Sequence, residues 1–357
     1  MSINQKLKEN VELAPLTTFK IGGKARYFIE AESAEEIIAA LKFADENKFG
    51  VFILGGGSNI LISDEGFDGL VLQIANKGIS VKESDDSVLV TAKAGEDWDE
   101  FVEFCVQREL AGLECLSGIP GLVGGTPIQN VGAYGQEVSE TITNVKVYDR
   151  KTKNILDLSN EECNFEYRTS IFNSTDKDRF TVLAVTYRLK KNGEPKITYA
   201  DLLNHFTTAK PNLREVREAV KKIRASKGML VRQGGLDSQS AGSFFKNPVV
   251  SNEKFAEIER IADERNLLGQ NEIVPSYKAG ENLIKIPAAW LIERAGFSKG
   301  YTNGNAGLST LHTLALTNRG DAKASDIIKL KKEIEKKVKE IFGIELQTEP
   351  NFIGFNF

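Results

Sequence analysis

Glycine is concentrated in two segments of the chain, 55–59 (Gly-Gly-Gly-Ser-Asn) and 117–135, which includes Gly-Ile-Pro-Gly-Leu-Val-Gly-Gly-Thr-Pro. Because glycine has no side chain, such loops can turn several backbone N–H groups toward one point and approach a ligand closely, which suits a diphosphate. Either loop taken alone is equally consistent with a plain turn. Two such loops in one chain predict one long ligand that is held at two sites.

Polar side chains are spaced through the second glycine segment, within a frame of glycine and proline. They are Ser117, Thr126, Gln129, Asn130 and Tyr134. Backbone N–H groups in this segment could bind phosphate, while the side chains supply hydrogen-bond partners for a ring.

Three further residues could take part in acid–base or charge-stabilising chemistry. Arg168 lies among aromatic and apolar residues, where an arginine usually satisfies carbonyls or a carboxylate but can also stabilise an oxyanion. Ser243 is either a turn residue or, in a dry pocket, a proton donor to a carbanion. Glu349 precedes Pro350 in a strand-like segment, and is either an exposed edge-strand carboxylate or a group held at a fixed kink.

The pattern of the first half predicts short strands and few helices. The expected strands cover 25–31, 51–54, 70–74, 88–92, 143–149, 153–158 and 180–189. One helix begins after Ser33, in a capping box that ends at Glu36, and another runs from 95–97 to Arg108. No helix is expected directly after the first glycine segment, so the Rossmann arrangement of strand, loop and helix is excluded.

Helices dominate the pattern beyond a polar boundary region at 190–212. They are expected at 212–226, 252–266, 287–295 and 324–342. The last carries an apolar stripe (Leu330, Ile334, Val338 and Ile341), and its lysines form a solvated face. The segment 345–354 reads as a strand interrupted by proline. We therefore expect an α+β protein of two or three packed domains.

Composition narrows the classes of function. The 46 basic and 50 acidic residues are well mixed, so nothing marks a surface for nucleic acid or for an anionic membrane. Residues 1–20 lack the basic start and apolar run of an export signal, so we expect a cytoplasmic protein without a membrane segment. The cysteines at 105, 115 and 163 read as buried thiols, and the histidines at 205 and 312 as structural residues without a metal site.

Six groups of residues, taken together and in order, resemble the UDP-N-acetylenolpyruvoylglucosamine reductase family. They are Leu54–Asn59, Gly118–Gly121, Gln129–Gly135, Tyr167–Arg168, Ala241–Pro248 and Glu349–Gly354. The resemblance implies a vanillyl-alcohol-oxidase-type (PCMH-type) FAD-binding domain in two lobes, followed by a C-terminal α+β substrate domain. The implied lobes are 1–75, joined by the C-terminal strand 343–357, and 76–210, and the implied substrate-binding domain is 211–342.

The same resemblance implies a reaction. The family transfers hydride from NADPH to FAD and then to UDP-N-acetylglucosamine enolpyruvate, whose enolate is protonated to give UDP-N-acetylmuramate for peptidoglycan synthesis. Arg168 and Glu349 match the pair that stabilises the enolic intermediate, and Ser243 matches the proton donor. The positions that match residues holding the UDP-sugar are Tyr134, Tyr199, Lys227 and Asn247, of which Tyr199 indicates the form of the family with an extra tyrosine segment.

The residues that the resemblance assigns to FAD lie in the two glycine segments. They are Gly55, Gly56, Gly57, Ser58, Asn59, Ser117, Gly118, Ile119, Pro120, Gly121, Gly124, Thr126, Gln129, Asn130, Gly132 and Ala133. Many flavoproteins of this fold attach FAD through a histidine in the flavin domain. Because the chain has no histidine before His205, we expect FAD to be bound non-covalently, with the three catalytic residues beside its isoalloxazine ring.

Two other functions fit part of the pattern. A related flavin oxidase would act on a sugar or a lactone with oxygen as oxidant. It would need neither to hold a diphosphate nor to protonate a carbanion, so Lys227, Ser243 and Asn247 argue against it. A nucleotide-sensing binding protein of the same fold would have no use for Arg168, Ser243 and Glu349. The reductase therefore explains more of the residues than either alternative does.

Overall fold

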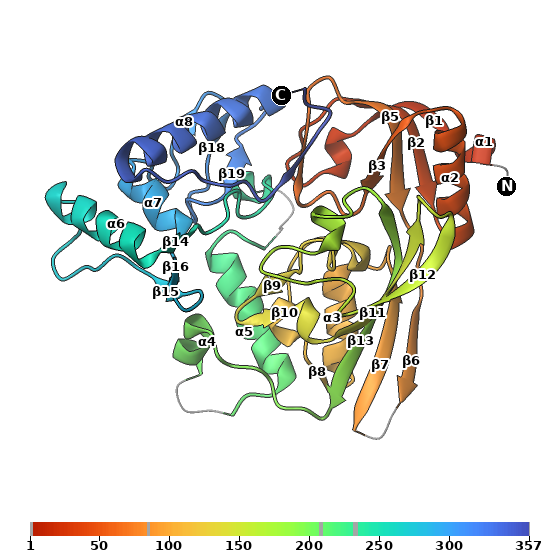
Figure 1. The fold of residues 1–357 in the computed structure, drawn as a ribbon, viewed down its shortest axis with the longest axis horizontal. Coiled ribbons are helices and arrows are strands. Elements are labelled where there is room, and N and C mark those ends of the chain that lie inside the picture. The colour runs from red at the N-terminus through yellow and green to blue at the C-terminus, as the bar shows by residue number, and fades with distance from the viewer. Residues whose placement is uncertain (1–2, 84–85, 207–209, 231–234, 357) are drawn as a thin grey trace. The chain divides into compact units, whose positions relative to one another are not determined.

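The computed structural model describes residues 3–83, 86–206, 210–230 and 235–356, which form two compact units (Figure 1). Unit 1 comprises Met1–Glu12, Lys24–Gly57 and Phe67–Leu230, and unit 2 comprises Leu13–Gly23, Ser58–Gly66 and Val231–Phe357. The first glycine segment is divided between the units after Gly57. Of the predicted boundary region 190–212, residues 207–209 lie outside the described residues.

A four-stranded sheet in unit 1 has the order β1-β2-β5-β3. Its strands are Lys8–Glu12 (β1), Lys24–Ala31 (β2), Phe67–Ile74 (β5) and Gly50–Leu54 (β3), of which β2, β5 and β3 run parallel. The helix Ala34–Glu46 (α2) begins after Ser33, whose Oγ accepts a hydrogen bond from the Glu36 N–H. It buries Ile37 and Leu41 and packs on this sheet (Figure 1). The three strands and the helix predicted for this region are confirmed.

A larger, antiparallel sheet of unit 1 has the order β12-β11-β13-β7-β6. Its strands are Asn154–Ser159 (β12), Ile142–Asp149 (β11), Phe180–Lys191 (β13), Ser87–Lys93 (β7) and Ile79–Glu83 (β6), and Leu110–Ala111 (β8) pairs with β13. The helix Trp98–Gln107 (α3) follows β7, and its Trp98 and Phe101 rings pack against Tyr187 of β13. All the predicted elements of this sheet are confirmed, whereas the polar strand β6 was not predicted.

Two helices follow in unit 1, Ala200–His205 (α4) and Leu213–Ser226 (α5). Asn212 caps α5, because its Oδ1 accepts the Glu215 N–H while the Glu215 carboxylate accepts the Asn212 N–H, at 3.0 and 2.8 Å. The predicted helix at 212–226 is thus confirmed. The contacts group α5 with unit 1, whereas the three-part division at 75, 210 and 342 remains a prediction.

Over its described residues, unit 2 combines three α-helices with short strands. The helices are Asn252–Glu264 (α6), Ala288–Arg294 (α7) and Ala324–Phe342 (α8). The strands are Ile60–Ile62 (β4), Val249–Ser251 (β14), Tyr277–Lys278 (β15), Leu283–Lys285 (β16), Thr302–Asn303 (β17), Ala306–Leu308 (β18), Leu316–Asn318 (β19) and Asn351–Ile353 (β20). β20 begins directly after Pro350 and pairs in parallel with β4. The α+β content and the helices predicted for this region are confirmed.

In the long helix α8, the regular spacing of apolar residues explains why the helix could be predicted from the sequence. Leu330, Ile334 and Val338 are completely buried, as the stripe predicted, whereas Ile341 is only partly buried. The buried face extends instead to Ile327 and Phe342. Asp64 caps this helix, because its carboxylate accepts the N–H groups of Ala324 and Ser325 at 2.7 and 3.1 Å. A cap supplied from so far along the chain leaves no local pattern, so it was not predicted.

Two further observations concern the cysteines and the length of the apolar helices. All three cysteines are buried, as predicted, and burial raises the pKa of each thiol. Within residues 3–83, 86–206, 210–230 and 235–356, no helix is both long enough and apolar enough to span a bilayer.

Candidate active site

The two glycine loops touch each other in unit 1. A Cβ atom on Gly56 would lie 2.7 Å from the Cα of Gly121, and one on Gly55 would lie 4.0 Å from Leu122. Real Cβ atoms do not approach backbone so closely, so glycine at 56 is required for the loops to meet. The sequence prediction that both loops serve one ligand therefore agrees with their contact.

The second loop is fixed by the start of α3 and by α5. The Gly118 N–H donates to Oδ1 of Asp99 at 2.6 Å, and the Gly118 carbonyl accepts from Nε of Arg224 at 3.0 Å. The Gly124 N–H donates to the Ala94 carbonyl at 2.8 Å, and a Cβ on Gly124 would lie 2.6 Å from the Cβ of Ala94. The path of the loop is therefore determined by packing and hydrogen bonds inside unit 1.

Gly125 of the second loop faces open space. A Cβ on Gly125 would meet no heavy atom within 4 Å. Gly56 and Gly124 are thus needed for packing within the protein, whereas Gly125 is exposed and packs against nothing, although its N–H donates to the Leu122 carbonyl at 3.0 Å. A glycine at this exposed turn leaves room for the close approach of a diphosphate, as in a dinucleotide such as FAD.

Three polar side chains predicted to bind the cofactor instead bond within the chain. The Ser117 Oγ donates to the Glu114 carbonyl at 2.7 Å, and the Thr126 Oγ1 lies 2.8 Å from the hydroxyl of Tyr187. Both side chains, and that of Asn130, are at least 97 % buried. These residues hold the shape of the loop, so any contribution they make to cofactor binding passes through the backbone.

Arg168 lies against the second glycine loop. It occupies a tight turn in which Glu166 and Thr169 exchange backbone hydrogen bonds, and its φ of 56° is left-handed. Its Nη2 donates to the Gly132 carbonyl at 2.7 Å, and its Nη1 donates to the Asn130 carbonyl at 3.5 Å. A non-glycine residue in this conformation requires support from its surroundings, which is typical of functional sites.

Three of the four predicted UDP-sugar residues gather in unit 1. The rings of Tyr134 and Tyr199 meet edge to face with centroids 5.6 Å apart, and Lys227 forms an ion pair with Asp201 at 2.5 Å. Burial raises the pKa of the Tyr134 hydroxyl, while the nearby charges of Arg224 and Lys227 oppose that shift. The structure therefore brings an aromatic pair and an ammonium group into one place.

Arg224 connects the second glycine loop with the cluster of Tyr134, Tyr199 and Lys227. It was not predicted from the sequence. It is 8 % exposed, and its guanidinium bonds the Gly118 and Met229 carbonyls while lying beside the Tyr134 hydroxyl. Burial lowers the pKa of this arginine. The available signal was its position on the apolar face of α5, where Val216 and Val220 are also buried.

Ser243 and Glu349 are brought together in unit 2. The Glu349 N–H donates to the Phe244 carbonyl at 2.9 Å, and the Lys246 N–H donates to the Gln347 carbonyl at 2.8 Å. The serine segment and the C-terminal segment therefore run side by side. Ser243 is half-buried and follows Gly242, which has a left-handed φ of 70°.

The end of the first glycine segment also reaches this part of unit 2. The Asn59 Nδ2 donates to the Glu349 carbonyl at 3.4 Å, and the Asn351 N–H donates to the Asn59 carbonyl at 3.0 Å. Asn247 lies nearby in sequence, and its Oδ1 accepts the Ala288 N–H at 2.9 Å, which caps α7. Ser243, Asn247 and Glu349 thus belong to unit 2, and Arg168 to unit 1.

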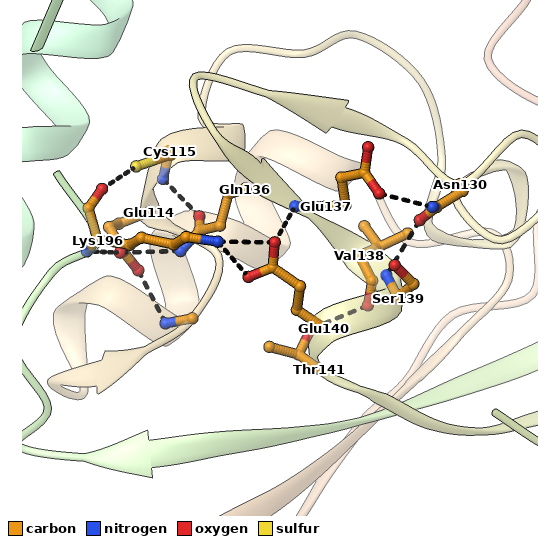
Figure 2. Close-up of polar contacts among 11 residues, drawn as sticks. Glu114, Cys115, Asn130, Gln136, Glu137, Val138, Ser139, Glu140, Thr141 and Lys196 are labelled. Carbon is orange, nitrogen blue, oxygen red and sulfur yellow. Dashed lines mark hydrogen bonds and ion pairs between the residues drawn. The ribbon is translucent and has the colours of Figure 1, made fainter. Parts of the chain in front are cut away.

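A hydrogen-bond network supports the hairpin that follows the second glycine loop. Gly132–Ala133 (β9) pairs with Gln136–Glu137 (β10). Figure 2 shows Gln136 bonded to the buried Glu114, and Glu140 bonded to Lys196. Gly132 and Ala133 were assigned to FAD from the sequence, whereas Glu114, Gln136, Glu140 and Lys196 were not singled out, because they bond across segments that are distant in sequence. Over the part of the chain that the structure describes, no group of acidic, cysteine or histidine side chains could hold a metal ion.

Comparison with known families gives two matches along the chain. Residues 25–159 match a family described as an FAD binding domain, and residues 234–353 match one described as UDP-N-acetylenolpyruvoylglucosamine reductase, C-terminal domain. The first match contains both glycine loops completely, and the second contains Ser243 and Glu349.

Individual proteins of known name are similar in sequence to this chain over almost its whole length. A UDP-N-acetylenolpyruvoylglucosamine reductase of Thermobifida fusca is 46 % identical, covering 97 % of both chains. Another, from Streptomyces coelicolor, is 44 % identical over 96 % of this chain and 89 % of its own. A solved structure of the Thermus caldophilus reductase has a TM-score of 0.62 at 24 % identity, with 96 % of this chain and 97 % of that chain covered. The last comparison confirms the predicted fold.

Proposed function

The chain belongs to the UDP-N-acetylenolpyruvoylglucosamine reductase family, and from this premise we propose that it reduces UDP-N-acetylglucosamine enolpyruvate to UDP-N-acetylmuramate for peptidoglycan synthesis. It is an FAD-dependent oxidoreductase with a PCMH-type flavin domain. The observation that carries the assignment is the identity of 46 % over 97 % of the chain. As reductant we propose NADPH, and as location the cytoplasm.

The glycine loops fit FAD. Gly56 and Gly124 allow the loops to pack, and at Gly125 the space that a Cβ would occupy has no heavy atom within 4 Å, which leaves room for a ligand. FAD, when bound, supplies a carrier that accepts hydride from the nicotinamide and delivers it to the substrate. We propose non-covalent binding, because no histidine precedes His205 in the chain.

Arg168 is proposed to stabilise negative charge on the substrate. Hydride addition to the enolpyruvyl double bond places negative charge on the carboxylate side, where a fixed planar cation with several donors stabilises the transition state. The guanidinium is already held by the Gly132 and Asn130 carbonyls. It therefore needs little reorganisation when charge develops.

Ser243 is proposed to donate the proton that completes the reaction. Its hydroxyl lies in a segment whose backbone is paired with the Glu349 segment, so a small donor is held at a constant position. Glu349 is proposed to stabilise the enolic intermediate together with Arg168. If Glu349 acts as a hydrogen-bond donor, it must be protonated at that step.

The remaining residues are proposed to hold the UDP-sugar. The Lys227 ammonium suits a diphosphate, and the Tyr134 and Tyr199 rings provide apolar surface with hydroxyl groups at their edges. Asn247 uses its Oδ1 to cap α7, which leaves its amide N–H groups for a substrate oxygen.

A two-step anaerobic titration tests the proposal. NADPH should bleach the flavin absorbance of the purified holoenzyme, and UDP-N-acetylglucosamine enolpyruvate should then restore it with formation of UDP-N-acetylmuramate. Acid precipitation should release the yellow chromophore into the supernatant. Restoration by oxygen with no response to the enolpyruvyl substrate would instead identify an oxidase, and would overturn the proposal.

A further inference from the structure

The second glycine loop contains a buried amide whose hydrogen bonds all run inward. Asn130 is 1 % exposed and has a left-handed φ of 44°. Its Nδ2 donates to Oε2 of Glu137 at 2.9 Å and to the Glu166 carbonyl at 3.1 Å. Its Oδ1 accepts the Ser139 N–H at 3.1 Å, as Figure 2 shows. Both donor hydrogens of the amide are therefore used within the protein.

Two of the groups around Asn130 hold Arg168. The Glu166 carbonyl accepts a hydrogen bond from the Asn130 side-chain amide. It also accepts the Thr169 N–H at 3.1 Å, and this second bond closes the turn that carries Arg168. The backbone carbonyl of Asn130 itself accepts from Arg168 Nη1 at 3.5 Å. Asn130 thus fixes both the backbone turn of Arg168 and one acceptor of its guanidinium.

Glu137 is the charged partner in this arrangement. It lies in β10 directly opposite Gly132 of β9. A Cβ on Gly132 would lie 2.8 Å from Cγ of Glu137 and 3.4 Å from Nη1 of Arg168, so the glutamate and the guanidinium lie against the same glycine. A carboxylate acceptor makes the bond from Asn130 stronger than a neutral acceptor would.

We propose that Glu137 is a positioning residue for Arg168 and acts through the side chain of Asn130. The inference rests on the function proposed above, in which Arg168 stabilises the charge that develops on the substrate. Without Glu137, the amide would rotate away from the Glu166 carbonyl, and the turn would hold the guanidinium less firmly. Loss of orientation slows a step that depends on a fixed cation even when binding is retained.

Glu140 provides a matched control in the same hairpin. It is also a glutamate, and its carboxylate bonds the Lys196 ammonium at 2.8 Å and the Glu137 N–H at 3.2 Å (Figure 2). Removal of this side chain loosens the hairpin but leaves the bond from Asn130 to the Glu137 carboxylate. A purely structural role of Glu137 would make the two glutamates equivalent.

The test is a double-mutant cycle on NADPH-reduced holoenzyme, read as the single-turnover rate of flavin reoxidation by UDP-N-acetylglucosamine enolpyruvate. We expect Glu137→Ala to slow reoxidation about 10- to 100-fold and Glu137→Gln, which still accepts the Asn130 bond, to restore most of the rate. In an Arg168→Ala background, Glu137→Ala should add less than about twofold, because its effect passes through Arg168. Flavin reduction by NADPH should stay within about twofold of wild type in each Glu137 variant.

Three results would overturn the inference. One is an equal effect of Glu137→Ala with and without Arg168; another is equal slowing of both half-reactions; the third is a Glu140→Ala variant as slow in reoxidation as Glu137→Ala. Flavin content and the rate of flavin reduction show whether each variant is folded. Failure of the proposed function has a different signature, because reduced wild-type holoenzyme would then not respond to the enolpyruvyl substrate at all.

Discussion

The two regions that carry the proposed chemistry are held in different ways. In unit 1, the glycine loop is held by side chains, since Arg168 and Arg224 donate to its backbone carbonyls. In unit 2, the Ser243 segment is held by backbone, since the Glu349 N–H donates to the Phe244 carbonyl. Substitution of an arginine therefore changes geometry in the first region, whereas substitution of Ser243 leaves the backbone pairing of the second region in place.

Packing reinforces this difference. Phe244 and Phe245 next to Ser243 are at most 1 % exposed, and Phe244 meets the ring of Phe19 edge to face. These rings and the paired backbone determine where the serine hydroxyl lies. In unit 1, by contrast, Asn130 and Arg168 have left-handed backbone conformations that depend on side-chain bonds. Around Ser243, the reactive side chain can therefore be replaced without a change in the local backbone. Around Arg168, the reactive side chain also holds the local backbone in place.

The largest expected effect is that of Ser243→Ala, which tests the region around Ser243. Removal of one donor in a transition state typically slows the step about 10²- to 10³-fold. We expect this slowing in flavin reoxidation by the enolpyruvyl substrate, with flavin reduction by NADPH and thermal stability close to wild type. Stopped-flow absorbance and thermal unfolding measure these quantities. A variant that slows both half-reactions equally would place Ser243 in binding or folding instead.

Arg168→Lys tests the region around Arg168. A lysine ammonium cannot replace the planar fork that reaches two carbonyls at once, so we expect reoxidation to slow about 10²-fold. Because the Gly132 and Asn130 carbonyls also lose donors, FAD should dissociate more readily from this variant than from Ser243→Ala. Equilibrium titration of apoprotein with FAD checks this point. Equal FAD affinity in the two variants would break the contrast between the regions.

A pair of glycine substitutions separates packing from ligand binding within unit 1. A Cβ at Gly56 would collide with Gly121, so Gly56→Ala should destabilise the apoprotein by about 1 to 3 kcal/mol. A Cβ at Gly125 meets no heavy atom within 4 Å, so Gly125→Ala should unfold like wild type and lose affinity only for FAD. Urea unfolding of apoprotein and FAD titration of each variant measure the two effects. Destabilisation by Gly125→Ala would show that this glycine serves packing as well.

The parts of the site that were predictable are those with a local pattern. Glycine at 55–57 and the segment around Ser243 stand out because their composition departs from that of ordinary strands and helices. The strands and helices of both units were predicted where apolar residues recur at a regular spacing, as in α8. Short or polar strands such as β6 and β15 were missed because they have no such pattern.

The direction of a side chain was much less predictable. Ser117, Thr126 and Asn130 are polar residues in a loop, and sequence reasoning assigned them to the ligand; the structure bonds their side chains to the protein. The contacts of Asp99 and Arg224 with the loop could not be predicted for a related reason. Both residues lie in helices, α3 and α5, that are distant from Gly118 in sequence. Composition identifies a loop, but the packing of the surrounding elements decides which way its side chains turn.

The smallest effect expected here concerns Asp99, which joins α3, α5 and the glycine loop. Its carboxylate accepts the Gly118 N–H at 2.6 Å and Arg217 Nη2 at 2.9 Å. Burial alone would raise the pKa of Asp99, but the bonds from Arg217 and Gly118 outweigh burial, so the pKa lies below its usual value. A lowered pKa stabilises the fold at neutral pH, and this contribution is lost as pH falls through the folded-state pKa.

Asp99→Asn should therefore lower the free energy of unfolding by about 1 to 2 kcal/mol near neutral pH. The difference from wild type should shrink in acid, because Asp99 of the wild type is then protonated and no longer charged. Urea unfolding of apoprotein at neutral and acid pH measures it. Glu103→Gln is the matched control, because Glu103 also pairs with Arg217, at 3.3 Å, but is half exposed, and its effect should be smaller. A difference for Asp99→Asn that persists in acid would mean that side-chain shape, and not charge, holds the glycine loop to α5.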